Sequence, residues 1–297
     1  MPQLDLRDDG STAGSVEAGL DALDTPVVAP DGSRLRRIAA RVLPPVGAVV
    51  VLVAIWQALW AAAFWPEFKL PAPVDVWGQI WQLVTSGEIA ELFWVSVHRA
   101  VIGFAISLLI AVPLGLAIAN LRVVRRGIGP LVSGLQSLPS VAWVPAAILW
   151  FGLTDATVYF VVLMGAVPSI VNGLIAGVEQ VPPQLRRVGT VLGAGRTRLA
   201  TLVVLPAALP GYVAGLKQGW AFSWRSLMAA EIIAVGGTIG FGLGSMLQQS
   251  RELADIAGVL ATVLVILAIG ILIELVFFAP LERRMLRRRG LLQGGTR

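Results

Sequence analysis

The sequence has no cysteine, a single histidine and two lysines, and each shortage excludes a class of chemistry. Without cysteine there is neither a disulfide framework nor a thiolate metal site. Neither Lys69 nor Lys217 ends a glycine-rich loop of the kind that holds ATP phosphates. His98 lacks the arrangement of an intramembrane serine protease, and its position beside Arg99 is typical of a polar interface residue. We therefore predict that this chain is not an enzyme and holds no metal or cofactor.

Charge is also scarce. Charged residues make up 14% of the 297 residues, hydrophobic residues make up 56%, and the mean hydropathy is +0.79. Soluble domains carry about 25% charged residues. The net charge of +5 comes from arginines beside apolar segments, which favours the surface of a membrane over nucleic acid as the partner. The composition predicts a membrane protein.

The chain divides by composition into four parts. Residues 1–33 mix acidic residues with Gly, Ser, Ala and Pro, which predicts a disordered acidic tail. Residues 34–65 form a basic juxtamembrane segment and a first transmembrane helix. Residues 66–282 form the core of the protein, with a notable loop at about 181–201, and residues 283–297 form a basic tail.

Apolar segments predict an all-α membrane protein with six transmembrane helices, because about 20 helical residues cross a hydrocarbon core. Eighteen of the 23 Lys and Arg residues fall on one side of these segments, which predicts that both termini and both tails are cytoplasmic. The six segments are Val46–Trp65, Leu92–Ala119, Pro130–Phe151, Ala156–Val178, Leu202–Phe222 and Ile256–Ala279.

Proline and glycine are frequent inside these segments, as at Pro113, Pro168, Gly173 and Gly215. Small residues let membrane helices approach closely, and proline bends them. Bent, closely packed helices suit a moving pathway, although Gly and Pro are also more common in membrane helices in general.

Two segments are expected outside the membrane on the side opposite the tails. Residues 229–248 are too interrupted by glycine to span, and we expect them to dip into this face and then form a short amphipathic helix. Residues 66–91 contain apolar residues at helical spacing over 74–84.

The loop at about 181–201 carries the strongest motif. Pro182 and Pro183 suit a helix start, and Leu185, Val188 and Leu192 then fall on one face. The run 193–195, Gly-Ala-Gly, should end this helix and turn the chain into the fifth span. A short helix with an apolar stripe and a basic flank suits docking into a partner's groove, or an interfacial helix held by lipid.

This loop resembles the permeases of binding-protein-dependent ABC importers, which carry Glu-Ala-Ala, three residues, Gly, nine residues, Ile, one residue and Leu-Pro. Here Gly193 and the Leu-Pro match at the family's spacing, Val203 takes the place of Ile, and Arg187 takes the place of the glutamate. The resemblance implies coupling to an ATPase subunit through Leu185, Arg187, Val188, Gly189, Leu192, Gly193, Ala194, Leu205 and Pro206.

Further local matches resemble the nitrate, taurine and aliphatic-sulfonate branch of this family. They include residues 70–73 (Leu-Pro-Ala-Pro), 150–152 (Trp-Phe-Gly) and 240–242 (Gly-Phe-Gly). The resemblance implies the type I ABC importer permease architecture in a bacterial cell membrane. It also implies a homodimer, two ATPase subunits that bind ATP and Mg, and an extracytoplasmic substrate-binding protein. An aliphatic sulfonate is the expected substrate, with nitrate, taurine, bicarbonate and a pyrimidine-like compound as alternatives.

Ionisable and polar residues inside the spans are candidates for the translocation path. Three cationic side chains, Arg99, Lys217 and Arg225, would suit an anionic substrate. Glu231 could instead neutralise one of them, and the side chain of Arg225 could extend outward to the interface. We expect Trp220 and Trp224 to be interfacial anchors rather than part of a substrate box, and Glu274 has no assigned role. The path candidates are Arg99, Asn172, Lys217, Gln218, Arg225 and Glu231.

Two other classes remain open. An ion-coupled secondary transporter would work without an ATPase, but the sequence shows no convincing inverted repeat. A membrane scaffold would not need spans so rich in Pro and Gly. Binding of an ATPase subunit would separate all three classes.

Overall fold

The computed structural model describes residues 34–288. The predicted acidic tail at 1–33 and the last part of the predicted basic tail, 289–297, lie outside the described residues. The chain forms two compact units, one ending at Leu59 and the other beginning at Trp60. In the first unit, α2 (Arg34–Ala61) contains the apolar stretch Leu43–Ala61, which is long enough to cross a membrane.

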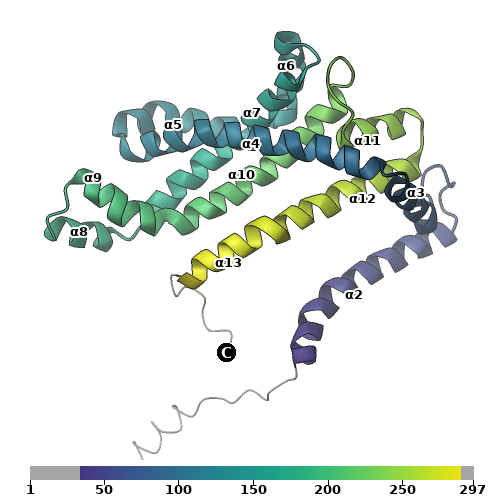
Figure 1. Cartoon of the computed structure of the whole chain (residues 1–297), viewed down its shortest axis with the longest axis horizontal. Helices are drawn as coiled ribbons and strands as arrows, with labels where there is room; N and C mark the ends of the chain where they lie inside the picture. Colours follow the sequence, from purple (N-terminus) through teal and green to yellow (C-terminus); the bar gives the residue numbers. More distant parts are fainter. Residues whose placement is uncertain (1–33, 289–297) are drawn as a thin grey trace, which may run out of the picture. The chain divides into compact units, whose positions relative to one another are not determined.

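The described residues of the second unit form helices joined by turns and loops, with no strand among them (Figure 1). The helices that meet the length and composition of a span number five in the described chain, or six if one sharply bent pair is a single span. After α2, the elements are α3 (Pro73–Ser86), α4 (Glu88–Asn120), α5 (Arg122–Ser137), η1 (Ser140–Trp143), α6 (Val144–Phe151), α7 (Asp155–Glu179), α8 (Pro183–Val191), α9 (Arg196–Leu199), η2 (Ala200–Val204), α10 (Leu205–Ile233), α11 (Leu243–Glu252), α12 (Ile256–Ile273), η3 (Glu274–Phe278) and α13 (Ala279–Arg288).

The segment predicted as the third span, 130–151, is a sharply bent pair of helices rather than one continuous helix. The chain breaks after Ser137, and α5 and the η1–α6 segment meet at an angle of 98°. Pro139 explains the break, because it lacks an N–H and disfavours helical geometry at Leu138, which is extended at φ −80° and ψ 125°. The bend brings residues 135–141 to the side of the bundle, where they line a pocket described below.

The fifth and sixth spans are longer than predicted. Helical residues run without interruption from Thr197 to Ile233 and from Ile256 to Arg287. Each contains a π-helical turn that ends just before a proline: η2 precedes Pro206, and η3 precedes Pro280. Proline offers no N–H to the helical ladder, and the backbone accommodates it with bonds of wider spacing, such as Leu205 N–H to Ala200 O. Pro206 therefore lies inside a continuous helix rather than at its entry.

Helices α7 and α10 form the closest packing in this unit and lie side by side in Figure 1. Glycines face glycines along their contact. A Cβ added at Gly215 would lie 2.7 Å from the Cα of Gly173, and one added at Gly211 would lie 2.5 Å from the Cα of Gly177. The expected close approach of small residues is confirmed, because no side chain fits between these backbones.

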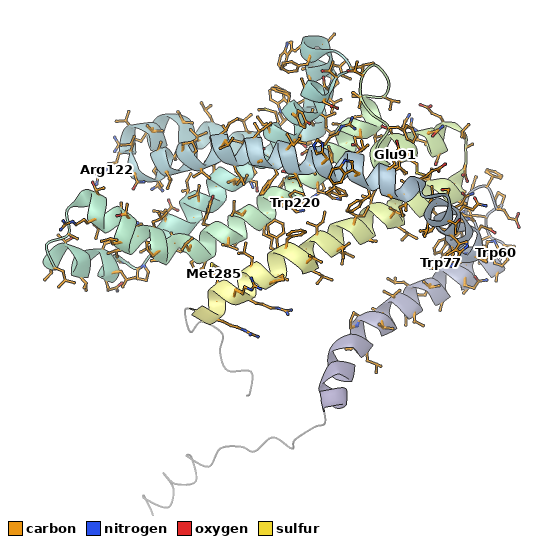
Figure 2. All side chains as sticks on the ribbon, in the orientation of Figure 1. Trp60, Trp77, Glu91, Arg122, Trp220 and Met285 are labelled. Atoms are coloured by element: carbon orange, nitrogen blue, oxygen red, sulfur yellow. The ribbon has the colours of Figure 1, made fainter. Side chains whose placement is uncertain are left out.

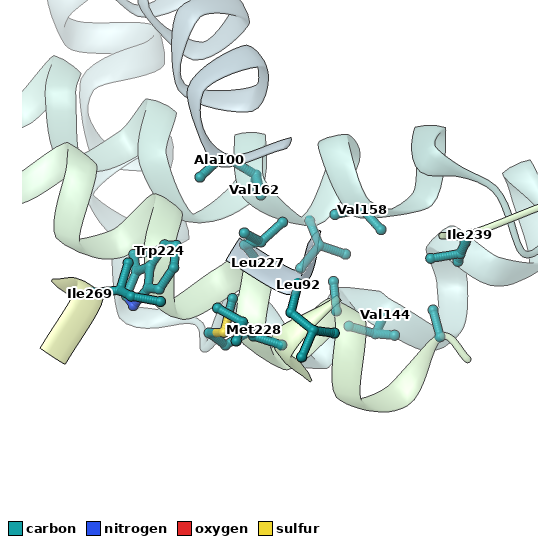
Figure 3. Close-up of a cluster of buried hydrophobic side chains, with 14 of the residues drawn as sticks. Leu92, Ala100, Val144, Val158, Val162, Trp224, Leu227, Met228, Ile239 and Ile269 are labelled. Atoms are coloured by element: carbon teal, nitrogen blue, oxygen red, sulfur yellow. The ribbon is translucent and has the colours of Figure 1, made fainter. Parts of the chain in front are cut away.

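The largest apolar core lies between α4, α7, α10 and α12 (Figure 3). Trp220 and Trp224 belong to it, with 7% and 8% of their surface exposed. Trp220 packs edge-on against Phe104 at a centroid distance of 5.4 Å. The prediction that these tryptophans are interfacial anchors is therefore wrong. They lie on the α10 face that packs into the bundle, and burial of their large rings stabilises it.

The unit has two ends with different structures. We call the end that carries α3, α6 and α11 the α11 end, and the end that carries α8 and α9 the α8 end (Figure 1). At the α11 end, the predicted helix over 74–84 is confirmed as α3, and the predicted short helix is confirmed as α11. Residues 229–233, expected in the loop, instead complete α10. At the α8 end, the helix start at Pro183 is confirmed.

Candidate functional site

A buried charged network joins four helices at the α11 end. Arg99 of α4 and Glu231 of α10 are 4% and 0% exposed. Arg99 Nη1 donates to Glu231 Oε1 at 3.2 Å and to the carbonyl of Gly240 at 3.0 Å. Arg99 Nη2 lies 2.8 Å from Asp155 Oδ1 at the start of α7, an ion pair whose alignment is not that of a hydrogen bond. The network thus satisfies two charges that would be costly to bury alone.

The Glu231 carboxylate is held from a second side. Ser96 Oγ donates to Glu231 Oε2 at 2.8 Å and accepts the backbone N–H of Leu243 at 2.9 Å. The N–H of Gly244 donates to Glu231 Oε2 at 3.0 Å. Both of these N–H groups lie at the start of α11, where the helix dipole favours a negative charge. Glu231 therefore ties the loop before α11 to the bundle.

Glycines allow this loop to approach the network. A Cβ at Gly242 would lie 2.6 Å from Glu231 Oε1 and 2.7 Å from Ser96 Oγ, and one at Gly244 would lie 2.5 Å from Glu231 Cβ. The Gly-Phe-Gly motif at 240–242 is thus explained by close backbone contact. Sequence reasoning did not find Ser96 or Asp155. Ser96 could have been found, because it precedes Arg99 by one helical turn and shares its face.

Lys217 is also neutralised. Its Nζ lies 2.5 Å from Glu274 Oε1 and 3.6 Å from Glu282 Oε2, which places α10 beside η3 and α13. Glu274, which had no assigned role, is therefore an ion-pair partner. Gln218 is exposed on α10. Neither residue lines the pocket at the helix break described next.

A pocket of about 330 Å³ lies at the break between α5 and η1. The hydroxyls of Ser140 and Ser226 are 2.7 Å apart, which joins η1 to α10 beside it. We call this the break pocket. It combines polar groups with an apolar wall, and it is lined by Leu135, Gln136, Ser137, Leu138, Pro139, Ser140, Val141, Met164, Gly165, Phe222, Arg225 and Ala229.

Arg225 is the path candidate that lines the break pocket. Its Nε donates to the carbonyl of Ala221 at 3.2 Å, and its guanidinium carbon lies 4.9 Å from the centre of the Phe222 ring. Among the ion pairs of the described residues, none involves Arg225. Of the three cations predicted in the spans, two are thus paired with carboxylates, and Arg225 keeps a positive charge at a pocket.

Asn172 lies next to the same region. Its Nδ2 donates to Oε1 of Gln136, and Ser133 Oγ lies 3.5 Å from its Oδ1. Gln136 also lines the break pocket. The structure therefore brings Asn172 and Arg225 to one side of the bundle and places Arg99 and Glu231 in a separate network.

Three of the predicted coupling residues, together with Val191, which was not predicted, form an exposed apolar surface at the α8 end. Val191 and Leu192 are 86% and 80% exposed, and Leu185 and Val188 are also exposed. Gly189 is buried, with Leu199 against it. Gly193 has φ +80°, a left-handed conformation that suits glycine, and the N–H of Ala194 bonds back to the Gly189 carbonyl. This turn fixes α8 against α9 and leaves its apolar face open. Arg187 is exposed on α8.

A family model described as the binding-protein-dependent transport system inner membrane component matches residues 111–287, more than half of the chain. The chain belongs to this family. It is therefore the membrane permease component of an ABC importer and a multi-pass protein of the bacterial inner membrane.

Curated relatives cover most of the chain. It is 28% identical to the taurine transport system permease protein TauC of Escherichia coli over 86% of this chain and 93% of that protein. It is 27% identical to the nitrate import permease protein NrtB of Synechocystis sp. over 82% and 88%. Other relatives are named for aliphatic sulfonate and bicarbonate transport.

The fold is similar to that of a solved ABC transporter. The inward-facing MetNI methionine ABC transporter contains a chain that matches with a TM-score of 0.56 and 17% identity. The match covers 66% of this chain and 95% of that one. This likeness confirms the type I importer permease fold.

Proposed function

We propose that this permease imports a small anion, with an aliphatic sulfonate as the expected substrate, and that the break pocket is part of its path. The observation that carries the proposal is Arg225, which adds an uncompensated positive charge to the pocket lining. A cation beside a pocket attracts anions and disfavours cations. Relatives named for taurine, sulfonate, nitrate and bicarbonate transport support an anionic substrate.

The wall of the break pocket favours a sulfonate over the smaller anions. Beside Arg225, the amide N–H groups of Gln136 and the hydroxyl of Ser140 could donate hydrogen bonds to sulfonate oxygens. Val141, Met164 and other apolar side chains line the rest of the pocket and suit a short alkyl group. Nitrate and bicarbonate have no alkyl group and would gain nothing from that wall.

The partners follow from the two ends of the unit. The exposed apolar face of α8 supports docking into a groove of an ATPase subunit, in which ATP and Mg would be held. The arginine distribution supports a cytoplasmic location for this end and for both termini. The α11 end would then face an extracytoplasmic substrate-binding protein. A second copy of the permease would complete the path as a homodimer, with ATP hydrolysis in a separate subunit.

The test is anion uptake by the full complex in proteoliposomes, containing the permease, its ATPase and its binding protein. We expect Arg225→Gln to lower sulfonate uptake at least tenfold, since a lost charged contact is worth about 1.5–3 kcal/mol. Arg225→Lys should retain part of the activity. Arg122→Gln, which removes an exposed arginine at the start of α5, away from the break pocket and from α11, is the matched control and should transport normally.

Two outcomes would contradict the proposal. If Arg225→Gln takes up sulfonate at the wild-type rate, the break pocket is not on the path. If the wild-type chain moves substrate down an ion gradient without an ATPase, the chain works as a secondary transporter. Competition by nitrate, bicarbonate and taurine in the same assay would separate the substrate alternatives.

A further inference from the structure

Helix α3 has an apolar face that the described residues leave largely exposed. Val74, Trp77, Trp81 and Val84 follow one another at intervals of three and four residues, which places them on one side of the helix. They are 71%, 65%, 60% and 48% exposed. We call these four residues the α3 stripe. Two exposed tryptophans at helical spacing form a contiguous apolar surface, and contact of such a surface with water is unfavourable.

The other sides of α3 either pack into the bundle or carry polar residues. Val76, Ile80 and Leu83 pack into the bundle, and α3 contacts α4 and α12 there. Gln82 and Ser86 are exposed on the polar side of the helix. The helix is thus apolar over two adjoining faces and polar over the third, and one of the two apolar faces is left open.

The α3 stripe is free of charge. The charged residue of α3 is Asp75, whose Oδ2 accepts the N–H of Ala72 at 3.2 Å and so caps the start of the helix. Tryptophans concentrate where membranes meet water, because the ring is apolar and its N–H still finds polar groups. A neutral face with two tryptophans therefore fits the boundary between lipid headgroups and acyl chains.

The position of α3 agrees with that boundary. Gly87, in the left-handed conformation at φ 81°, caps α3, and α4 begins at the next residue, so the chain turns directly from α3 into a span. Figure 1 shows α3 nearly end-on, whereas α4 and α12 run across the view. Helix α3 thus crosses the ends of the spans, and in Figure 2 Trp77 lies at this end while Trp220 lies within the bundle.

Apolar side chains are also exposed on α4 and α12, the two helices that α3 contacts. Trp94 on α4 is 67% exposed near the same end, and Leu267 is exposed along α12. Both belong to spans of a multi-pass membrane protein. A protein partner on the stripe would have to cover tryptophans at the level where the spans leave the bilayer.

We propose that the α3 stripe binds membrane lipid, so that α3 lies along the surface of the leaflet at the α11 end with Trp77 and Trp81 inserted among the lipids. This contact fixes how deep the α11 end sits in the bilayer. It is independent of which substrate the permease moves and of which side of the membrane this end faces.

The chain has no cysteine, so single cysteines can be spin-labelled in the full-length protein without removing native thiols. We would place labels at Trp77→Cys and Trp81→Cys, with Gln82→Cys and Ser86→Cys as controls on the polar side. The permease with its ATPase subunits would be placed in nanodiscs of phosphatidylcholine and phosphatidylglycerol. Collision rates with oxygen, which concentrates in lipid, and with a water-soluble nickel chelate would then be measured by electron paramagnetic resonance.

We expect the oxygen-to-nickel collision ratio to be several-fold higher at 77 and 81 than at 82 and 86. Equal ratios at all four positions would place the stripe in water and overturn the proposal. Low collision rates with both reagents at 77 and 81 would show a covering protein, such as a second copy, and would also overturn it.

The tryptophan substitutions remove large side chains, so the same measurement at Val74→Cys and Val84→Cys gives a second set with smaller changes. These labels belong to the same stripe and should show the same high ratio. A low ratio at Val74 and Val84 in folded, monodisperse protein would contradict lipid contact. Transport activity is not the readout, so failure here is distinguishable from failure of the proposed anion import.

Discussion

The two ends of the helical unit differ in the side chains that they bury and expose. At the α11 end, charged Arg99 and Glu231 are buried, and each has several partners within its own chain. At the α8 end, apolar Val191 and Leu192 are exposed, and the described chain does not cover them. The charged network of the first end is satisfied within the chain, whereas the apolar face of α8 at the second end is open to something outside the chain.

This difference separates stability from coupling. Changes in the α11-end network should destabilise the permease alone, because the partners left behind are buried. Changes on the apolar face of α8 should leave the isolated permease intact and alter only what it does with an ATPase. Stability and coupling can therefore be measured separately, in the purified chain and in the full complex.

The largest expected effect on stability comes from Glu231→Ala. It leaves Arg99 without its buried carboxylate partner and leaves Ser96 and the Gly244 N–H unpaired, which should cost about 4 kcal/mol of unfolding free energy. Thermal unfolding of the purified permease in nanodiscs measures the loss. Glu179→Ala is the control, because its ion pair with Arg125 is half exposed and should contribute less than about 1 kcal/mol.

A double variant sharpens this test. Arg99→Met with Glu231→Leu leaves no unpaired buried charge and should be more stable than Glu231→Ala alone. If the double variant is instead the less stable of the two, hydrogen bonds to the loop before α11 matter more than the charge pairing.

A smaller loss is expected from Gly215→Ala on α10. The new Cβ would lie 2.7 Å from Gly173 Cα, and backbone cannot move aside as a flexible side chain can, so we expect a cost of about 2–3 kcal/mol. Gly134→Ala on α5 has open space around it and should be neutral or slightly stabilising. Equal stability of both variants in thermal unfolding would show that α7 and α10 are less tightly packed than described.

Local sequence signals were enough for much of the fold. Apolar length predicted the helical spans, and the bounds of α8 followed from Pro182, Pro183 and Gly193, because proline and glycine act on their own neighbourhood. The position of α3 also followed from helical spacing. The family motif predicted the exposed coupling face, although its contact with an ATPase stays a prediction.

Signals that depend on distant parts of the chain were missed. To predict the bend after Ser137, Pro139 must be recognised as a helix break rather than as one of the prolines that membrane helices tolerate. Trp220 and Trp224 were placed at the interface from their residue type, whereas their burial depends on which face of α10 meets α4 and α12. Asp155 joins Arg99 across 56 positions of sequence, and nothing local marks it as a partner.

The same limit applies to the path candidates. The count of cations in the spans favoured an anion, but a count does not show which cations are already paired. The structure pairs Arg99 and Lys217 with carboxylates and leaves Arg225 beside the break pocket. The charge argument therefore rests on one residue rather than three.

The smallest expected effect on stability comes from Leu192→Glu on α8. The side chain is 80% exposed, so the unfolding free energy of the isolated permease should change by less than about 0.5 kcal/mol. In the full complex, a charge on the docking face would be buried against an apolar groove, so stimulation of ATP hydrolysis by the binding protein should be lost.

Thr190→Glu is the matched control for this change, since Thr190 is exposed on the opposite side of α8. It adds the same charge to the same helix and should keep the stimulation. If both variants lose stimulation equally, net charge at the α8 end matters rather than its apolar face. If Leu192→Glu lowers thermal stability as much as Gly215→Ala, Leu192 packs within the permease, and the contrast between the two ends fails at the residue that defines it.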